Sequence, residues 1–260
     1  MRAGSRGLLS PAWRRMLALL LWWGLFPFEA QADLPATVTR VKQSIVAVGT
    51  YVAVGSPRFR FLGTGFVVGD GNRVVTNAHV VASVPEGGDE KLVIALPGSG
   101  RVVARPVRRD ASDAVHDLAL LGFDGPPLPA LTLGDSNAVR EGQDVAITGF
   151  PLGGSIGIVP VTHKGIVSAL TPIGQPLSSA GQLDGRTVRR LAAGGYSVLQ
   201  LDIVSYPGNS GSPLYDPDTG EVLGVLNMVF VKGAKETALT NPSGISYAIP
   251  VGFLKALLNP

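Results

Sequence analysis

The 260-residue chain contains no cysteine. Disulfide bonds, thiolate metal sites and a cysteine nucleophile are therefore excluded. Export is not excluded, because an exported protein can fold without disulfides. Charged residues are also few, at 16% of the chain, while 45% of the residues are hydrophobic. This balance excludes a disordered chain and predicts a folded protein with a buried core.

Histidine is nearly as scarce, since His79, His116 and His163 are the only three. Any general base of the histidine type must be one of them. Glycine and proline are abundant, with 34 and 20 residues. Such a composition is typical of many short strands joined by tight turns.

The first 32 residues have the pattern of a signal peptide. Four arginines precede an apolar run of 13 residues, 16–28, and Ala30-Gln31-Ala32 follows as a cleavage site. The run is shorter than the roughly 20 residues that span a membrane. We therefore expect export to the periplasm or beyond, with no stable membrane span in the mature chain. An uncleaved anchor is the alternative.

Removal of this leader changes the net charge. It takes four of the 22 basic residues and one of the 19 acidic residues, so eighteen of each sign remain in the mature chain. A neutral chain without a basic patch does not indicate nucleic-acid binding.

The apolar patterning predicts an all-β fold. Short helices are expected at the two ends of the mature chain, 34–43 and 251–258. About a dozen strands favour barrels or a sandwich over a doubly wound sheet. The expected strands are 45–54, 61–68, 74–76, 92–96, 101–107, 118–121, 145–148, 157–167, 198–204, 212–215, 222–229 and 244–249.

Two stretches interrupt this pattern. Residues 171–195 are rich in glycine and lack strand signals, which is typical of a functional or mobile loop. We interpret them as a candidate activation loop, because they directly precede the strand that leads to Ser210. Residues 105–110 form a charge cluster that suits a solvated strand edge.

A histidine and an aspartate occupy positions suited to acid–base chemistry. His79 directly follows a predicted strand, and Asp117 heads the apolar strand 118–121. A partly buried carboxylate needs a hydrogen-bonding partner, although a solvated loop position is the alternative for Asp117. His116 is a poor partner, because adjacent residues on an extended chain point to opposite sides. A more distant histidine is expected.

Ser210 lies in the glycine-rich stretch 206–214, where consecutive backbone N–H groups can converge beside a hydroxyl. The order His79, Asp117, Ser210 is that of the chymotrypsin-type arrangement. A lipase- or esterase-like hydrolase would need the reverse order and a G-x-S-x-G elbow. Ser136, in a Gly-Asp-Ser triplet only 19 residues after Asp117, opens a polar turn and is not expected to be the nucleophile.

Several motifs together resemble the protease domain of the Deg/HtrA family of trypsin-like serine proteases. They span roughly residues 36–255 in the family's order, and they are Gly63-Thr64-Gly65-Phe66-Val67-Val68, 76–81, 117–121, 133–136, 149–153, 165–169, 208–214 and 247–250. The resemblance implies two perpendicular six-stranded antiparallel β-barrels with a C-terminal helix. Residues 33–260 would form this domain, divided near 128–142.

The resemblance also implies roles for individual residues. His79 would be the base, Asp117 its orienting carboxylate and Ser210 the nucleophile, with no metal or cofactor required. The N–H groups of Gly208, Asn209 and Ser210 would line an oxyanion hole. Val204 would form the floor of the S1 pocket, together with Asn227 and Met228, and would favour aliphatic P1 residues.

Two departures from the family pattern leave points open. Ser212 replaces the commoner glycine two residues after the nucleophile, and no PDZ domain is expected after the protease domain. The oligomeric state is undetermined. The sequence predicts a serine endopeptidase that acts on polypeptides, chiefly unfolded or damaged exported proteins. The alternative is a latent or silent relative that binds unfolded chains or a partner.

Overall fold

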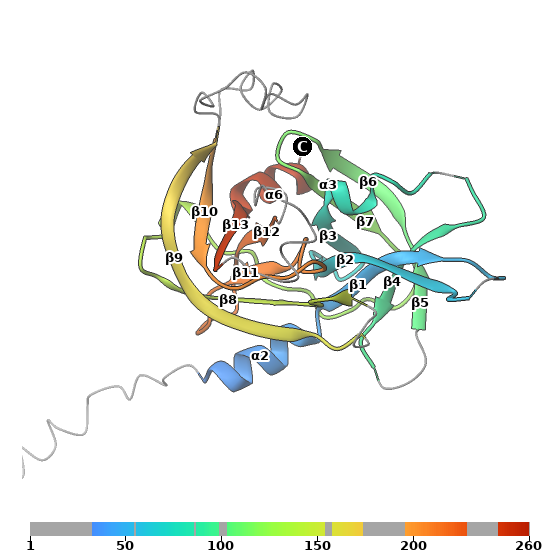
Figure 1. Cartoon of the computed structure of the whole chain (residues 1–260), viewed down its shortest axis with the longest axis horizontal. Helices are drawn as coiled ribbons and strands as arrows, with labels where there is room; N and C mark the ends of the chain where they lie inside the picture. The colour runs from blue at the N-terminus through green and yellow to red at the C-terminus, as the bar shows by residue number, and fades with distance from the viewer. Residues whose placement is uncertain are drawn as a thin grey trace, which may run out of the picture. The chain divides into compact units, whose positions relative to one another are not determined.

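Two antiparallel sheets, one from each half of the mature chain, form the architecture (Figure 1). The computed structural model describes residues 33–54, 56–85, 87–98, 103–153, 158–173, 196–227 and 244–259. The predicted leader, Met228 and residues 174–195 of the candidate activation loop lie outside these residues.

The first sheet has seven strands in the order β5-β4-β1-β2-β3-β7-β6. Runs of valine, alanine and leucine form its central strands, which are buried on both faces. The strands are β1 (Ile45–Tyr51), β2 (Phe59–Val68), β3 (Arg73–Asn77), β4 (Lys91–Leu96), β5 (Val103–Pro106), β6 (Arg108–Asp113) and β7 (Leu118–Gly122).

The second sheet closes into a barrel in the order β10-β13-β12-β11-β8-β9. The predicted fold class is therefore confirmed, although the first half forms a curled seven-stranded sheet and not the closed six-stranded barrel that was expected. The barrel strands are β8 (Asp144–Gly149), β9 (Val161–Ile173), β10 (Tyr196–Asp202), β11 (Pro213–Tyr215), β12 (Val222–Leu226) and β13 (Ile245–Pro250).

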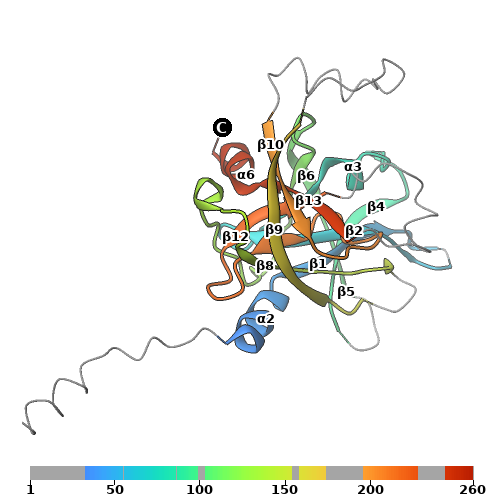
Figure 2. The ribbon, with the colours of Figure 1, turned by 60° about the vertical axis from the view of Figure 1, so that its left-hand side comes forward.

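Three apolar clusters fill this frame. One lies within the first sheet, one lies within the closed barrel, and the third joins residues of both halves. The third cluster includes Val41 of α2 (Leu34–Lys42) and Leu254 of α6 (Val251–Leu258). The α6 helix packs on β12 and reaches β6 and β7, so it spans the two sheets; Figure 2 shows α6 and α2 from a second side. Within the described ranges, no helix has the length and apolar character needed to cross a membrane.

Three local predictions need correction. The charge cluster at 105–110 does reach a solvated sheet edge, as expected, but residues 108–113 form a full strand, β6, that was not among the expected strands. Its side chains alternate between exposed and half-buried because successive residues of a strand point to opposite faces. The strand β9 continues to Ile173, into the stretch expected to lack strands. The short helices α3 (Ala78–Val81) and η1 (Ser136–Ala138) were not predicted, because a single turn carries no periodicity.

Candidate active site

Strand pairing brings His79 and Asp117 together. The end of β3 pairs with the start of β7, with Asn77 opposite Leu118. The chain turns into α3 directly after Asn77, and Asp117 directly precedes Leu118. The two candidate residues therefore lie side by side at the same end of these paired strands, although they are 38 positions apart in the sequence.

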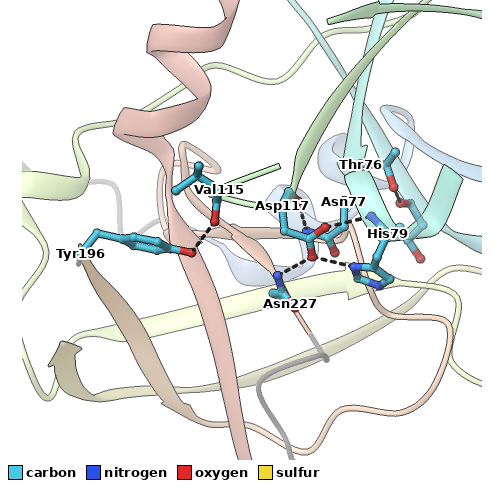
Figure 3. Close-up of polar contacts among 8 residues, drawn as sticks. Thr76, Asn77, His79, Val115, Asp117, Tyr196 and Asn227 are labelled. Carbon is cyan, nitrogen blue, oxygen red and sulfur yellow. Dashed lines mark hydrogen bonds and ion pairs between the residues drawn. The ribbon is translucent and has the colours of Figure 1, made fainter. Parts of the chain in front are cut away.

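Asp117 accepts hydrogen bonds through every oxygen it carries (Figure 3). Its Oδ2 atom lies 2.6 Å from His79 Nδ1 and 2.8 Å from Asn227 Nδ2. Its Oδ1 atom accepts from the backbone N–H of His79 at 2.8 Å, and its carbonyl accepts from the side chain of Asn77 and the N–H of Ala78. The Asp117 side chain is only 8% exposed. This carboxylate thus fixes both the backbone and the ring of His79.

Ser210 lies in a loop of two consecutive turns between β10 and β11. The N–H of Asn209 donates to the carbonyl of Tyr206, and the N–H of Ser212 donates to the carbonyl of Asn209, each at 3.0 Å. The N–H of Gly211 donates to Leu226, which ties the loop to β12. Ser210 itself is 7% exposed. The loop is therefore fixed by backbone bonds that do not involve the serine side chain.

Thr64 of β2 connects this loop to the histidine side of the site. Its backbone N–H donates to the carbonyl of Ser210 at 2.9 Å, and its Oγ1 donates to the carbonyl of Gly208 at 2.7 Å. Thr76 Oγ1, three residues before His79, donates to the Thr64 carbonyl at 2.7 Å. Sequence reasoning missed this role of Thr64, although Thr64 stands in the Gly63-Thr64-Gly65 motif that carried the family resemblance.

The neighbouring Gly63 touches both sides of the site. A Cβ atom on Gly63 would lie 2.9 Å from the methyl groups of Val80 and 3.2 Å from the carbonyl of Ser210. Within the described residues, no hydrogen bond joins Ser210 Oγ to the His79 ring. Such bonds are often long in a free enzyme and tighten when substrate binds.

The peptide group between Pro207 and Gly208 has a fixed orientation. Proline at the second turn position and Gly208 at the third, with a φ of +105°, are typical of a type II turn. The Pro207 carbonyl accepts from the N–H of Leu152 at 2.8 Å. Because the N–H of a trans peptide points away from its carbonyl, the Gly208 N–H points to the side opposite Leu152. Among the described residues, the N–H groups of Gly208 and Ser210 have no acceptor, whereas that of Asn209 closes the turn.

Replacing Gly208 with alanine should disrupt this turn. The new Cβ atom would lie 2.3 Å from the carbonyl oxygen of Phe150, in a backbone conformation that favours glycine. For the peptidase that the sequence predicts, we expect kcat to fall about 100- to 1,000-fold, because the loss of one oxyanion donor usually has this effect. Gly142→Ala is the matched control, because Gly142 also has a positive φ, of +82°, but open space around it. Equal losses in the two variants would contradict the assignment.

The serine at position 212 is accommodated by a glycine opposite. Ser212 is fully buried, and a Cβ atom on Gly149 would lie only 2.0 Å from Ser212 Oγ. The Ser212 side chain therefore occupies the space that any larger residue at position 149 would need. The departure from the family pattern leaves the turns around Ser210 in place.

The three predicted pocket residues have different surroundings. Val204 is 38% exposed, which leaves its apolar side chain available to a ligand. Asn227 is fully buried, and its amide donates to Asp117. Met228 lies outside the described residues. Asn227 therefore supports the carboxylate, a role that the sequence did not suggest.

The other two histidines lie outside this arrangement. His116 pairs with Asp113 and not with Asp117, as expected, but the reason differs from the one given by the sequence, because the two residues lie in a turn and not on an extended chain. His163 lies on β9 opposite Ile147, and its buried Nε2 atom has no hydrogen-bond partner in the described part of the chain. The described residues also contain no group of three or more acidic or histidine side chains that could hold a metal ion.

Burial lowers the pKa of His163 below 6.5, its value in an unfolded chain. As the pH falls, His163 therefore binds a proton at a higher pH in the unfolded chain than in the folded protein. Stability that is fully present above about pH 6.5 should be lost as the pH falls toward the folded-state value. Melting temperatures of the wild type and of His163→Gln, measured from pH 8 to pH 5, test this. The melting temperature of the wild type should fall more between pH 8 and pH 5 than that of the variant. Parallel curves of melting temperature against pH would contradict the prediction.

Comparisons with known proteins show which family this chain resembles. The model of the trypsin-like peptidase domain family matches residues 63–225. A Halomonas elongata protein named probable periplasmic serine endoprotease DegP-like is 34% identical over 192 residues, 74% of this chain and 33% of that protein. The mitochondrial serine protease HTRA2 of Drosophila pseudoobscura is 33% identical over 204 residues, 78% of this chain and 40% of that protein. The chain thus spans about a third of the length of the first of these curated relatives.

Solved structures share the fold. A variant of the HtrA-type protease AlgW with a tripeptide superposes with a TM-score of 0.62 and 26% identity, covering 87% of this chain and 62% of that one. The crystal structure of Deg5 has a TM-score of 0.60 over 85% of this chain and 90% of that one. Both halves of the described architecture therefore occur together in a solved HtrA-type protease.

Proposed function

Since this chain belongs to the trypsin-like peptidase family, and resembles its Deg/HtrA members, we propose that it is a serine endopeptidase. His79 is the general base, Asp117 orients it and Ser210 is the nucleophile. The substrates are polypeptides, and unfolded or damaged exported proteins are the class we expect.

The observation that carries this proposal is the bond between His79 Nδ1 and Asp117 Oδ2 at 2.6 Å. An ionised carboxylate can only accept, so the proton of the neutral ring lies on Nδ1. The other ring nitrogen, Nε2, is then free to take a proton. A general base needs this tautomer, and the Asp117 contacts with Asn227 and the His79 backbone support it.

The reaction follows from these roles. Substrate binding brings Ser210 Oγ and His79 Nε2 into hydrogen-bond contact, and His79 takes the proton as Oγ attacks the scissile carbonyl carbon. His79 then gives the proton to the leaving amine, which leaves an ester on Ser210. Water, activated by His79, hydrolyses this ester and restores the free serine.

The developing oxyanion needs donors that are already in position. We assign this task to the N–H groups of Gly208 and Ser210, which have no acceptor among the described residues. The N–H of Asn209, expected from the sequence to share in it, instead supports the turn. Preorganised donors of this kind commonly make the largest single contribution to catalysis.

Two finer assignments rest on the sequence and the relatives. The leader at residues 1–32 and the periplasmic relatives support export of the mature chain. The apolar, partly exposed Val204 supports small to medium aliphatic P1 residues. A basic P1 residue would find no charge at this position.

Active-site labelling tests the proposal. Mature protein starting at Asp33 is treated with a fluorophosphonate probe, the labelled peptide is identified by mass spectrometry, and casein cleavage is followed in parallel. We expect one label, on Ser210, and we expect His79→Ala to abolish both labelling and cleavage. His163→Ala is the matched histidine control and should remain active.

The alternative, a silent relative that binds unfolded chains, predicts a different result. Casein would then bind without being cut, and no serine would be labelled. Labelling at a serine other than Ser210 would also contradict the assignment.

A further inference from the structure

One histidine is close to the catalytic carboxylate in sequence but is absent from the mechanism. His116 directly precedes Asp117, in the turn that joins β6 to β7. Asp117 ends this turn with a positive φ of +55°. A left-handed backbone is uncommon for any residue except glycine, and it persists only where the surroundings impose it. The contacts of the turn should therefore reveal what imposes it.

Asp113, at the end of β6, organises the turn from one side. Its Oδ1 atom accepts from the backbone N–H groups of Val115 and His116 at 2.9 and 3.0 Å. Its Oδ2 atom accepts from the His116 ring at Nδ1, 2.5 Å away. Burial alone would raise the pKa of Asp113, but the bonds from His116 and Val115 outweigh it and lower the pKa below 3.8. The carboxylate therefore stays ionised and holds both the backbone and the ring of His116.

Aromatic rings from the second half of the molecule hold the turn from the other side. The His116 ring stacks on Phe253 of α6, with centroids 3.8 Å apart and planes inclined by 18°. Tyr196, the first residue of β10, lies 4.6 Å from the same ring. The Tyr196 hydroxyl also donates to the carbonyl of Val115 at 3.4 Å (Figure 3). The His116 ring is thus enclosed between the C-terminal helix, β10 and Asp113.

From this geometry we propose that His116 is a positioning residue, which fixes the turn that sets the Asp117 carboxylate against His79. The inference rests on the proposed function. His116 does not contact the substrate in this role. The α6 helix takes part, because its Phe253 supplies the surface on which the His116 ring stacks.

The expected signature is a loss in kcat without a loss in binding. A carboxylate displaced by a fraction of an ångström orients His79 poorly but leaves the substrate cleft unchanged. We expect His116→Ala to lower kcat roughly 10- to 100-fold, within the range for small misplacements of catalytic groups. KM should change by less than about threefold, because only an interaction that acts in the transition state is weakened.

A double-mutant cycle tests the route through α6. Phe253→Ala should lower kcat in the same direction, and the double variant His116→Ala/Phe253→Ala should lose less than the two single losses combined, because both remove the same contact. Leu257→Ala is the matched control, because Leu257 also packs on the core from α6 and has no ring contact with His116. It should lower the melting temperature while kcat stays within about twofold of wild type.

A spectroscopic measurement separates this inference from the proposed function. The short His79–Asp117 bond should give a far-downfield imidazole proton resonance, assigned by its absence in His79→Ala. This measurement does not need catalysis, so it is made on Ser210→Ala protein. We expect His116→Ala to weaken or shift the resonance, and Leu257→Ala to leave it unchanged. An unchanged resonance together with wild-type kcat in His116→Ala would overturn the inference, even if the protein is a protease.

Discussion

Replacing Ser210 with alanine should lower kcat for peptide cleavage by roughly a million-fold and abolish fluorophosphonate labelling. The variant should lose its nucleophile but keep its folded structure. The hydrogen bonds that hold the loop run from Thr64 N to the Ser210 carbonyl and from the Gly211 N–H to Leu226. None of them uses the hydroxyl, so the melting temperature should stay close to that of the wild type. Steady-state kinetics and calorimetry on the same preparation test both statements.

Ser136→Ala is the matched control for this variant. Ser136 stands in a Gly-Asp-Ser triplet, but its hydroxyl accepts a hydrogen bond from the N–H of Gly252 at 3.1 Å. We expect its variant to cleave at the wild-type rate. If Ser210→Ala kept more than about one per cent of the wild-type kcat, Ser210 would not be the nucleophile.

Replacing Asp117 with asparagine should lower kcat about 10,000-fold, as expected when the base is held in the wrong tautomer. In the asparagine variant the amide oxygen should take the Oδ1 position, because only an oxygen can accept the hydrogen bond from the backbone N–H of His79. The new amide group then faces the ring nitrogen of His79 and the amide of Asn227, which are both donors. His79 must move its proton to Nε2, and that nitrogen can no longer accept one from Ser210.

The pH dependence of kcat tests this explanation of the loss. At high pH, hydroxide can take part of the role of the base, so activity of Asp117→Asn should rise with pH above the wild-type optimum. Asp135→Asn is the control, because Asp135 caps η1 through the N–H of Asn137 and asparagine caps a helix equally well. If Asp117→Asn were only tenfold slower than wild type, Asp117 would not be the orienting carboxylate.

The sequence alone predicted the fold class, because short apolar strands between glycine-rich turns leave few other architectures. It also identified His79, Asp117 and Ser210 as candidates, since each follows or precedes a predicted strand within a recognisable motif. The strand register then explains how His79 and Asp117 meet: Asn77 pairs with Leu118. The pairing brings together two residues that lie far apart in the sequence. The sequence around Asp117 indicated that its partner is a distant histidine, but not how the two residues meet.

The supporting contacts could not be predicted in this way. Thr64 holds the carbonyl of Ser210, which is 146 positions away along the chain, and Asn227 holds Asp117 from the other sheet. Thr64 stands in a recognisable Gly-Thr-Gly motif, but neither its local sequence nor that of Asn227 shows which distant residue it contacts. The strand β6 was missed for a related reason: five of the six residues of Arg108–Asp113 are polar, so no apolar alternation marks the strand, and only the pairing with β7 identifies it.

The bond between Asn227 and Asp117 has a consequence for the life of the chain before folding is complete. Asn227 directly follows the last residue of β12, so a nascent or partly translocated chain that ends before it lacks the amide that donates to Asp117 Oδ2, and only the His79 ring remains as a partner for that atom. The residues that organise the carboxylate come from both halves of the protein. Proteolytic competence should therefore arise late, after the second barrel has formed.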